Sequence, residues 1–299
     1  MRFEFIADDH VKVKTFLKKH DVSKALLAKI KFSGGNILVN DQPQNAIYLL
    51  DIGDKVTIDI PAEPAFENLQ AVSRPLQILY EDQHFLVIEK PAGVASIPSV
   101  LHSNTMANFV KAYYVENNYE NQQVHIVTRL DKDTSGLMLF AKHGYAHARL
   151  DKQLQQKTIK KKYFALVKGE SLLPDQGDII APIARPDDSI ITRHVHKSGK
   201  YAHTSYETVA SYGDGIHLVD IHLLTGRTHQ IRVHFSHIGF PLLGDDLYGG
   251  SLGDGIDRQA LHCHRLEFFH PFKEEMIVLE SELPQDFQAV VTHLEKKRV

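Results

Sequence analysis

The sequence predicts an α+β protein with two parts, a small N-terminal α/β module and a larger domain built on a mixed β-sheet. Three observations support this fold class. Alternating apolar and polar residues, the pattern of a half-buried strand, recur along the chain. Two amphipathic helix patterns precede the first of these strand patterns, and a proline-rich stretch begins at Pro61. We place the module at residues 1–61, a linker at 62–74 and the larger domain at 75–299.

Length and composition fit two folded domains. The chain has 299 residues, of which 43% are hydrophobic, and this is enough for real cores. No run of about 18 apolar residues occurs, and the N-terminus lacks a signal-peptide pattern, so we expect a soluble cytoplasmic protein. The single cysteine, Cys263, excludes an intramolecular disulfide and a cysteine-rich zinc site.

The N-terminal module begins with two short amphipathic helices, predicted over Val13–Leu17 and Ser23–Ile30, the second capped by Ser23. A hairpin follows, with strands predicted in Gly34–Asp41 and Gly53–Ile60. Lysines crowd this module although the net charge of the chain is −3. They could neutralise phosphate groups or form an ordinary solvated face. These residues are Lys12, Lys14, Lys18, Lys19, Lys24, Lys29 and Lys31.

The larger domain opens with a predicted strand pair in Ile78–Asp82 and Phe85–Val94. The second strand runs into a Lys-Pro-Ala-Gly turn at residues 90–93, which we expect to be structural. Further strand patterns in Gly199–Glu207 and Gln259–Leu266 complete the predicted sheet.

The most informative segment is residues 129–137, which place the carboxylate of Asp131 in a tight polar turn between apolar runs. Val124–Leu130 alternates apolar and polar side chains, so we expect Asp131 where a strand ends and a turn begins. Catalytic groups are common at such loop positions. The alternative is an acidic turn capped by Thr134 and Ser135.

A second polar segment, Thr225–Phe235, carries two arginines near glycine and histidine. The apolar residues Ile231 and Val233 predict a strand or a short helix that could turn Arg227 and Arg232 toward a common anionic site. A solvated basic edge is the alternative.

A third segment, Lys160–Gly169, is a predicted strand that contains Tyr163. A tyrosine beside Phe164 in an apolar strand is more often a core residue than a ligand contact. Its ring could also stack on a nucleic-acid base, an interaction worth about 1–3 kcal/mol. The strand pattern leaves both interpretations open.

Together the three segments resemble the signature motifs of the RluA/RluD family of RNA pseudouridine synthases. The run RLDKDTSGL at residues 129–137 is the most specific part, and the second segment continues with Gly239–Asp245 and Tyr248–Gly249 in the family's order. The sequence departs from the family at two positions: Thr128 stands where histidine is usual, and Glu89 where asparagine is common.

The resemblance implies the pseudouridine synthase fold, a large mixed, mainly antiparallel β-sheet flanked by helices and loops. It also implies an enzyme that isomerises uridine in RNA to pseudouridine, with no cofactor and no metal. By resemblance Asp131 is the catalytic aspartate, Tyr163 stacks on the target base, and Arg232 forms a salt bridge with Asp131. A bidentate arginine within about 4–6 Å would keep a carboxylate ionised and fixed.

Other residues are expected to contact RNA. By resemblance Arg129 reaches into the RNA near the flipped uridine, and we expect Arg227 and His229 to bind RNA as well. Residues 1–61 resemble the S4-like RNA-binding domain, which favours large-subunit ribosomal RNA over transfer RNA as the substrate of a monomeric enzyme. The contacts expected in this domain are Lys24, Lys29 and Lys31.

Three alternatives remain open. The first is a noncatalytic RNA-binding or ribosome-assembly protein, against which the intact motif residues argue. The second is a glycosidic-bond hydrolase that uses Asp131 and Asp133, which point to opposite faces if the chain is extended there. The third is a metal site at His194–His196 or His262–His264, although neither pair adjoins a matching carboxylate motif.

Overall fold

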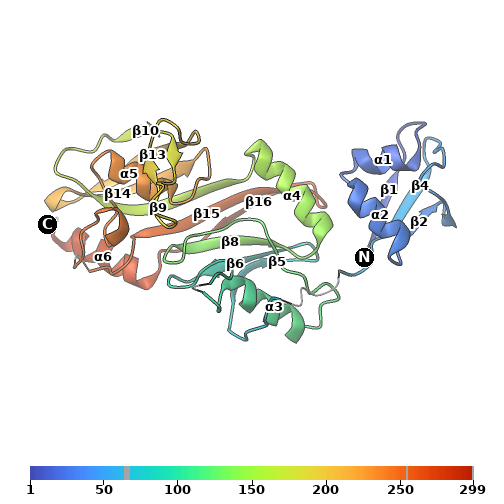
Figure 1. Ribbon diagram of the computed structural model, residues 1–299, viewed down its shortest axis with the longest axis horizontal. Coiled ribbons are helices and arrows are strands. Elements are labelled where there is room, and N and C mark those ends of the chain that lie inside the picture. The colour runs from blue at the N-terminus through green and yellow to red at the C-terminus, as the bar shows by residue number, and fades with distance from the viewer. Residues whose placement is uncertain (64–67, 101, 254, 298–299) are drawn as a thin grey trace.

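The computed structural model describes residues 1–63, 68–100, 102–253 and 255–297, so part of the predicted linker, residues 64–67, lies outside the described residues. The N-terminal module contains a 4-stranded antiparallel sheet with the order β1-β4-β2-β3 (Figure 1). Its elements are β1 (Arg2–Ile6), α1 (Val13–Lys19), α2 (Lys24–Phe32), β2 (Asn36–Val39), β3 (Gln42–Pro43) and β4 (Lys55–Asp59).

The two predicted helices of the module are confirmed, as is the cap of the second. The Ser23 hydroxyl accepts a hydrogen bond from the Leu26 N–H at 3.1 Å, which satisfies one of the unpaired donors at the start of α2. Phe16, Leu17 and Ile30 of these helices are fully buried in the core of the module. Strand β1, which the sequence did not predict, pairs with β4 and widens the hairpin into a sheet.

The larger domain contains a 10-stranded sheet whose main path is β10-β13-β14-β9-β15-β8-β6-β5, with β16 beside β15 and β7 beside β8 (Figure 1). Its strand pairs in the described residues are antiparallel except for β8 and β15, which are parallel. The predicted mixed, mainly antiparallel sheet is therefore confirmed. The strands are β5 (Gln77–Glu81), β6 (Phe85–Lys90), β7 (His125–Ile126), β8 (Ser135–Ala141), β9 (Lys160–Lys168), β10 (Gln176–Ile180), β13 (His203–Ser211), β14 (Ile216–Leu223), β15 (Leu261–His270) and β16 (Glu275–Glu280).

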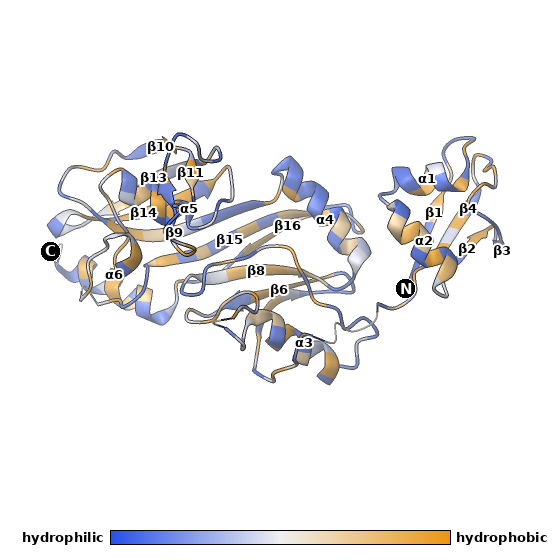
Figure 2. Ribbon diagram, viewed as in Figure 1, coloured by the Kyte–Doolittle hydropathy of each residue, from blue (hydrophilic) through white to orange (hydrophobic). Residues whose placement is uncertain are grey.

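Successive side chains of a strand point to opposite faces of the sheet. Apolar side chains of the sheet are buried by packing against helices. Alternate residues of β6 and β8 pack against α3 in one core, and α6 packs on β9 and β14 in a second core. Helices α4 and α5 pack on the central core. Figure 2 shows mainly apolar residues along β6 and β8, whereas α4 is largely hydrophilic. The remaining elements are α3 (Met106–Glu116), β11 (Ile183–Ala184), β12 (His194–Val195), η1 (Gly213–Gly215), α4 (Gly144–Gln156), α5 (Gln230–His237), η2 (Asp246–Tyr248) and α6 (Gln285–Lys297).

None of the described helices is both long enough and apolar enough to span a lipid bilayer.

The parallel pairing of β8 with β15 depends on Gly136. This residue has a φ of +114°, and a Cβ added to it would lie 2.3 Å from the carbonyl oxygen of Cys263. Any larger residue would push the two strands apart while also adopting a backbone conformation that L-residues avoid. The glycine therefore lets β15 approach the strand that follows the Asp131 turn.

The strand predicted over Val124–Leu130 is shorter than expected, because β7 ends at Ile126. Beyond it, side chains satisfy backbone groups that a regular ladder would have paired. The Thr128 hydroxyl accepts a hydrogen bond from the Leu139 N–H at 3.0 Å, and the Ser96 hydroxyl accepts one from the Leu130 N–H at 3.1 Å. The chain thus leaves the sheet before Asp131 and returns to it at Ser135.

The module contacts the larger domain through α4. The Tyr145 hydroxyl donates a hydrogen bond to the carbonyl oxygen of His20 at 2.6 Å, and Arg149 and Lys152 form ion pairs with Asp21 at 3.2 and 2.9 Å. The Phe3 ring packs edge-on against Tyr145, with ring centroids 5.0 Å apart. Polar and aromatic contacts together form this junction.

Candidate active site

The turn that carries Asp131 connects the end of an irregular segment to β8. The Thr134 N–H donates to the carbonyl oxygen of Asp131 at 3.2 Å, which closes the turn. The side chain of Asp131 keeps 29% of its surface exposed, so its carboxylate is accessible from solvent. The structure therefore places the predicted carboxylate at a turn, as the sequence indicated.

Lys90 stabilises this turn through a hydrogen bond to the main chain of Lys132. Its buried ammonium group donates to the carbonyl oxygens of Pro91, Val94 and Lys132 at 2.8, 2.7 and 2.8 Å. Burial lowers the pKa of Lys90 to about 7, although the charges of Asp131 and Asp133 oppose this shift. The Lys-Pro-Ala-Gly segment has the structural role expected of it, because its lysine ties two loops together.

Two further side chains, from the segment just before β15, hydrogen-bond to the turn. Arg258 donates to the carbonyl oxygen of Asp133 at 3.0 Å, and Gln259 donates to the Thr134 hydroxyl at 3.3 Å. The Ser96 hydroxyl donates to the carbonyl oxygen of Leu130 at 2.7 Å on the other side. Hydrogen bonds from several separate segments therefore restrict where the Asp131 carboxylate can point.

Arg232 extends from α5 toward Asp131, with Nη1 3.7 Å from Oδ2 of the carboxylate. The bidentate contact expected between these residues is absent, because the guanidinium fork binds Asp245 instead. Nε and Nη2 of Arg232 each donate to Asp245 at 2.7 Å, and Asp245 is fully buried. Burial of Arg232 disfavours its charge, but Asp245 outweighs this effect, so the pKa of Arg232 is raised.

His229 and Tyr248 complete the array around Asp131. Nε2 of His229 lies 4.0 Å from Oδ2 of Asp131, and Nδ1 lies 2.8 Å from the hydroxyl oxygen of Tyr248. The Tyr248 ring also lies beneath Arg232, with Cζ 4.9 Å from the ring centroid. Burial lowers the pKa of His229, although Asp131 opposes the shift. The sequence pattern predicted no role for Tyr248 or Asp245, although both lie in the glycine-containing run at residues 239–249 that resembles the family.

Tyr163 lies on β9 opposite Cys263 of β15 and is only 4% exposed. Burial raises its pKa well above the usual value, and the charge of Asp131 acts in the same direction. The hydroxyl is therefore protonated at neutral pH and suited to donate a hydrogen bond rather than to act as a base. Nζ of Lys161 lies 5.7 Å from the centre of its ring.

The predicted RNA-contact residues fall into two groups. Arg129 and Arg227 are exposed near the Asp131 turn and α5, and Nε of Arg227 donates to the carbonyl oxygen of Tyr201 at 3.0 Å. On α2, Lys24 and Lys31 are exposed, whereas Lys29 forms an ion pair with Glu63 at 3.2 Å. Arg129 therefore lies in the segment of Asp131 and Arg227 in the loop before α5, whereas the lysines lie on the separate N-terminal module.

In the second histidine pair considered as metal ligands, both rings make other contacts. His262 lies between the hydroxyls of Ser135 and Ser281, at 3.0 and 3.2 Å. His264 contacts Asp220 at 3.1 Å. Within the described residues, no group of three or more histidine, cysteine, aspartate or glutamate side chains is arranged to hold a metal ion.

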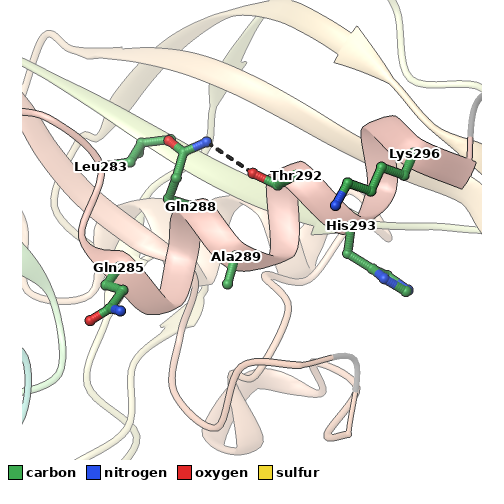
Figure 3. A pocket seen from close by; sticks show the side chains of 7 residues that line it. All are labelled: Leu283, Gln285, Gln288, Ala289, Thr292, His293 and Lys296. Atoms are coloured by element: carbon green, nitrogen blue, oxygen red, sulfur yellow. Dashed lines mark hydrogen bonds between the residues drawn. The ribbon is translucent and has the colours of Figure 1, made fainter.

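Two surface hollows lie outside the Asp131 array. One, of about 580 Å³, lies along α6, where Gln288 donates to the Thr292 hydroxyl at 3.3 Å (Figure 3). The other, of about 900 Å³, lies between the end of β9, the η1 turn and Pro241. Neither lining contains a residue of the array, so neither is a candidate for the substrate site.

Comparison with known proteins places this arrangement in a family. Residues 84–237 match the family model described as RNA pseudouridylate synthase. The chain is 42% identical over 280 residues to an uncharacterized RNA pseudouridine synthase of Bacillus subtilis, YjbO, and the match covers 93% of this chain and 98% of the relative. It is 39% identical over 236 residues to ribosomal large subunit pseudouridine synthase D of Pseudomonas aeruginosa, covering 75% and 73% of the two chains.

A solved structure, human RNA pseudouridylate synthase domain containing 4, has the same fold. It superposes with a TM-score of 0.61 at 24% identity and covers 73% of this chain and 93% of that chain. The predicted fold is therefore confirmed. From its motifs, its sheet and its relatives, the chain belongs to the RNA pseudouridylate synthase family and is an RNA pseudouridine synthase, an isomerase.

Proposed function

We propose that this enzyme isomerises particular uridines of large-subunit ribosomal RNA in the cytoplasm, with Asp131 as its catalytic aspartate. Names of relatives support the substrate. One relative from Pseudomonas aeruginosa is 39% identical over 236 residues, and one from Nitrosomonas europaea is 39% identical over 235 residues. Both are named ribosomal large subunit pseudouridine synthase D.

One observation carries the catalytic assignment, namely the surroundings of the Asp131 carboxylate. The group is partly exposed, and it lies 3.7 Å from the Arg232 guanidinium and 4.0 Å from the His229 ring. The braced turn limits the directions in which the carboxylate can point, and the Arg232 guanidinium places a positive charge beside it. A fixed, accessible carboxylate of this kind can act on a sugar or a base placed against it.

The proposed reaction begins when a uridine leaves its stack, which costs a few kcal/mol that protein contacts must offset. Arg129 would reach into the RNA near the flipped uridine, Arg227 would bind the RNA beside it, and the protonated Tyr163 would hold the base beside Asp131. The bond from ribose C1′ to uracil N1 then breaks, and the ring turns while it is held. C5 bonds to C1′, C5 loses its proton and N1 gains one, so the product is an isomer of the substrate.

The N-terminal module is proposed to add RNA affinity. Residues 1–61 would act as an S4-like RNA-binding domain, joined by residues 62–74 to a catalytic domain at 75–299. Lys24 and Lys31 support this role, because both are exposed and exposed lysines can neutralise phosphates. Lys29 already has a carboxylate partner, Glu63, and would contribute less.

The test uses ribosomal RNA labelled with tritium at C5 of uridine, because forming the new bond releases that tritium to water. We expect release by the wild-type protein, and a loss of about 10²–10⁴-fold or more in Asp131→Asn. Asp133→Asn is the matched control and should stay active. Arg258 bonds to the main-chain carbonyl oxygen of Asp133, which this substitution does not remove.

Each other outcome would contradict a named part of the proposal. Release from labelled transfer RNA but not from ribosomal RNA would show that transfer RNA is the substrate. Binding of all these RNAs without release would favour a noncatalytic RNA-binding protein. Equal activity of Asp131→Asn and Asp133→Asn would show that Asp131 is not the catalytic carboxylate.

A further inference from the structure

His229 has an unusual backbone conformation for its residue type. It precedes α5 with a φ of +56° and a ψ of +21°, in the left-handed region that residues other than glycine, asparagine and aspartate seldom adopt. Such strain persists where the surroundings impose it, and it concentrates at functional sites. The imposed conformation sets the imidazole between Tyr248 on one side and Asp131 on the other.

The hydrogen bonds of Tyr248 determine which nitrogen of His229 carries the proton. The Tyr248 hydroxyl oxygen accepts a hydrogen bond from the backbone N–H of Arg193 at 2.9 Å. The hydroxyl still has one hydrogen to donate, and Nδ1 of His229 is the acceptor within reach among the described residues, at 2.8 Å. A ring whose Nδ1 accepts a hydrogen bond carries its proton on Nε2.

Nε2 is the atom that faces Asp131. Burial also disfavours the charged form of the ring and lowers the pKa of His229. At neutral pH the group is therefore an uncharged imidazole whose Nε2–H points into the space beside the carboxylate. At 4.0 Å the N–H is too far from Asp131 to be satisfied by it, so a third group can take this donor.

We propose that His229 is a catalytic residue that donates its Nε2–H to an oxygen of the flipped uracil, in the tautomer fixed by Tyr248. This inference rests on the proposed function, because it uses the same site and the same substrate base. When the bond from C1′ to N1 breaks, its electron pair passes to the uracil ring and spreads onto the carbonyl oxygens. A fixed donor stabilises that developing charge, and the proton stays on His229 throughout.

Two substitutions separate this role from simple packing. The amide nitrogen of glutamine can occupy the position of Nε2, whereas asparagine reaches only the position of Nδ1. Asparagine adopts the left-handed backbone region more readily than glutamine does. His229→Asn should therefore fold at least as stably as His229→Gln, and yet it should be the less active of the two.

The experiment measures single-turnover tritium release, RNA affinity and melting temperature for both variants. We expect His229→Asn to lose about 10²-fold in rate at unchanged RNA affinity, as removal of a single oxyanion donor does. The rate of His229→Gln should remain within about tenfold of the wild-type rate, because the glutamine amide N–H can still donate to the uracil oxygen. His237→Asn, at the exposed C-terminal end of α5, is the matched control and should be unaffected. Equal rates for the two His229 variants, or a loss of RNA affinity that accounts for the loss of rate, would overturn the proposal.

A spectroscopic measurement tests the tautomer without RNA. The ¹⁵N NMR signals of His229 should show the proton on Nε2 in the wild-type protein and a mixture of tautomers in Tyr248→Phe. A wild-type signal with the proton on Nδ1 would overturn the inference. If the wild-type protein released no tritium from any RNA, the proposed function would fail, whereas these NMR signals would still report the state of His229.

Discussion

Arg232 carries one positive charge, and two carboxylates compete for it. Asp245 takes two hydrogen bonds of 2.7 Å, while Asp131 lies 3.7 Å away. Because the guanidinium fork is occupied by Asp245, the oxygens of Asp131 are not tied up in a short bidentate bond. Asp131 therefore has the electrostatic support of a cation and remains able to bond to a substrate.

At the residue scale, we predict that Asp245→Asn destabilises the protein by about 3–5 kcal/mol, the usual effect of removing one partner of a buried ion pair. Urea unfolding measures this difference. The control is Asp246→Asn, an exposed neighbour whose substitution should stay within about 0.5 kcal/mol of wild type. Similar unfolding midpoints for the two variants would show that the buried fork adds little to stability.

At the residue level, the motifs singled out two side chains that lie close together in the structure, whereas their catalytic roles stay predictions. Asp131 and Arg232 were identified from their segments, and the structure brings them to 3.7 Å. The second carboxylate was missed, because sequence spacing does not tell which of two aspartates an arginine will bind. The available signal was an acidic residue, Asp245, directly after the apolar and glycine residues 241–244.

At the element scale, α5 shows why short segments are ambiguous. Ile231 and Val233 fit a strand period, whereas Ile231 and Phe235 are spaced as on one face of a helix. Five residues cannot distinguish the two periods, and tertiary contacts decide. Burial of Ile231 and Phe235 in the central core selects the helix, and the turn before it presents His229 to the site.

The junction of β8 and β15 yields a prediction for glycine. Gly136→Ala should be strongly destabilising, because the new methyl group would meet the Cys263 carbonyl oxygen at 2.3 Å and the positive φ adds about 1–3 kcal/mol of strain. Gly93→Ala is the control, with a φ of +81° but nothing within 4 Å of the added Cβ. Melting temperatures of the two variants separate the effects, because Gly136→Ala has both backbone strain and a steric clash, whereas Gly93→Ala has backbone strain alone. Equal melting temperatures would show that β8 and β15 can move apart to accommodate the methyl group without loss of stability.

At the scale of the whole molecule, Glu63 joins the module to the larger domain. Its carboxylate contacts His125 at 2.6 Å and Lys29 of α2 at 3.2 Å, and it accepts a hydrogen bond from the Gly144 N–H at 3.1 Å. The proline-rich composition around Glu63 predicted a linker and gave no hint of these contacts. They join residues that are more than thirty positions apart, which local sequence patterns cannot reveal.

These contacts predict a pH dependence. Burial alone would raise the pKa of Glu63, but His125 and Lys29 outweigh it and lower the pKa to about 2. A lowered carboxyl pKa stabilises the fold above the ordinary value of 4.5, and this stabilisation is lost as the pH falls toward 2. Glu63→Gln should therefore be less stable than wild type by on the order of 2 kcal/mol at pH 7, and the difference should shrink below pH of about 4.5.

Urea unfolding of Glu63→Gln and wild type between neutral and acidic pH measures this difference. Glu4→Gln, an exposed position on β1, is the control and should follow the wild-type profile at every pH. A difference between Glu63→Gln and wild type that stayed constant with pH would place the effect in packing rather than in charge.

The position of β15 has a consequence for how the protein is made. This strand lies between β9 and β8 and connects the two halves of the large sheet, yet it begins only at residue 261. A nascent chain that has not yet reached it holds two half-sheets with open edges, which are templates for aggregation. The same late segment supplies Arg258 and Gln259, which brace the Asp131 turn. We therefore expect the site to assemble only after Arg258 and β15 have left the ribosome, and chaperones that shield strand edges to matter most before then.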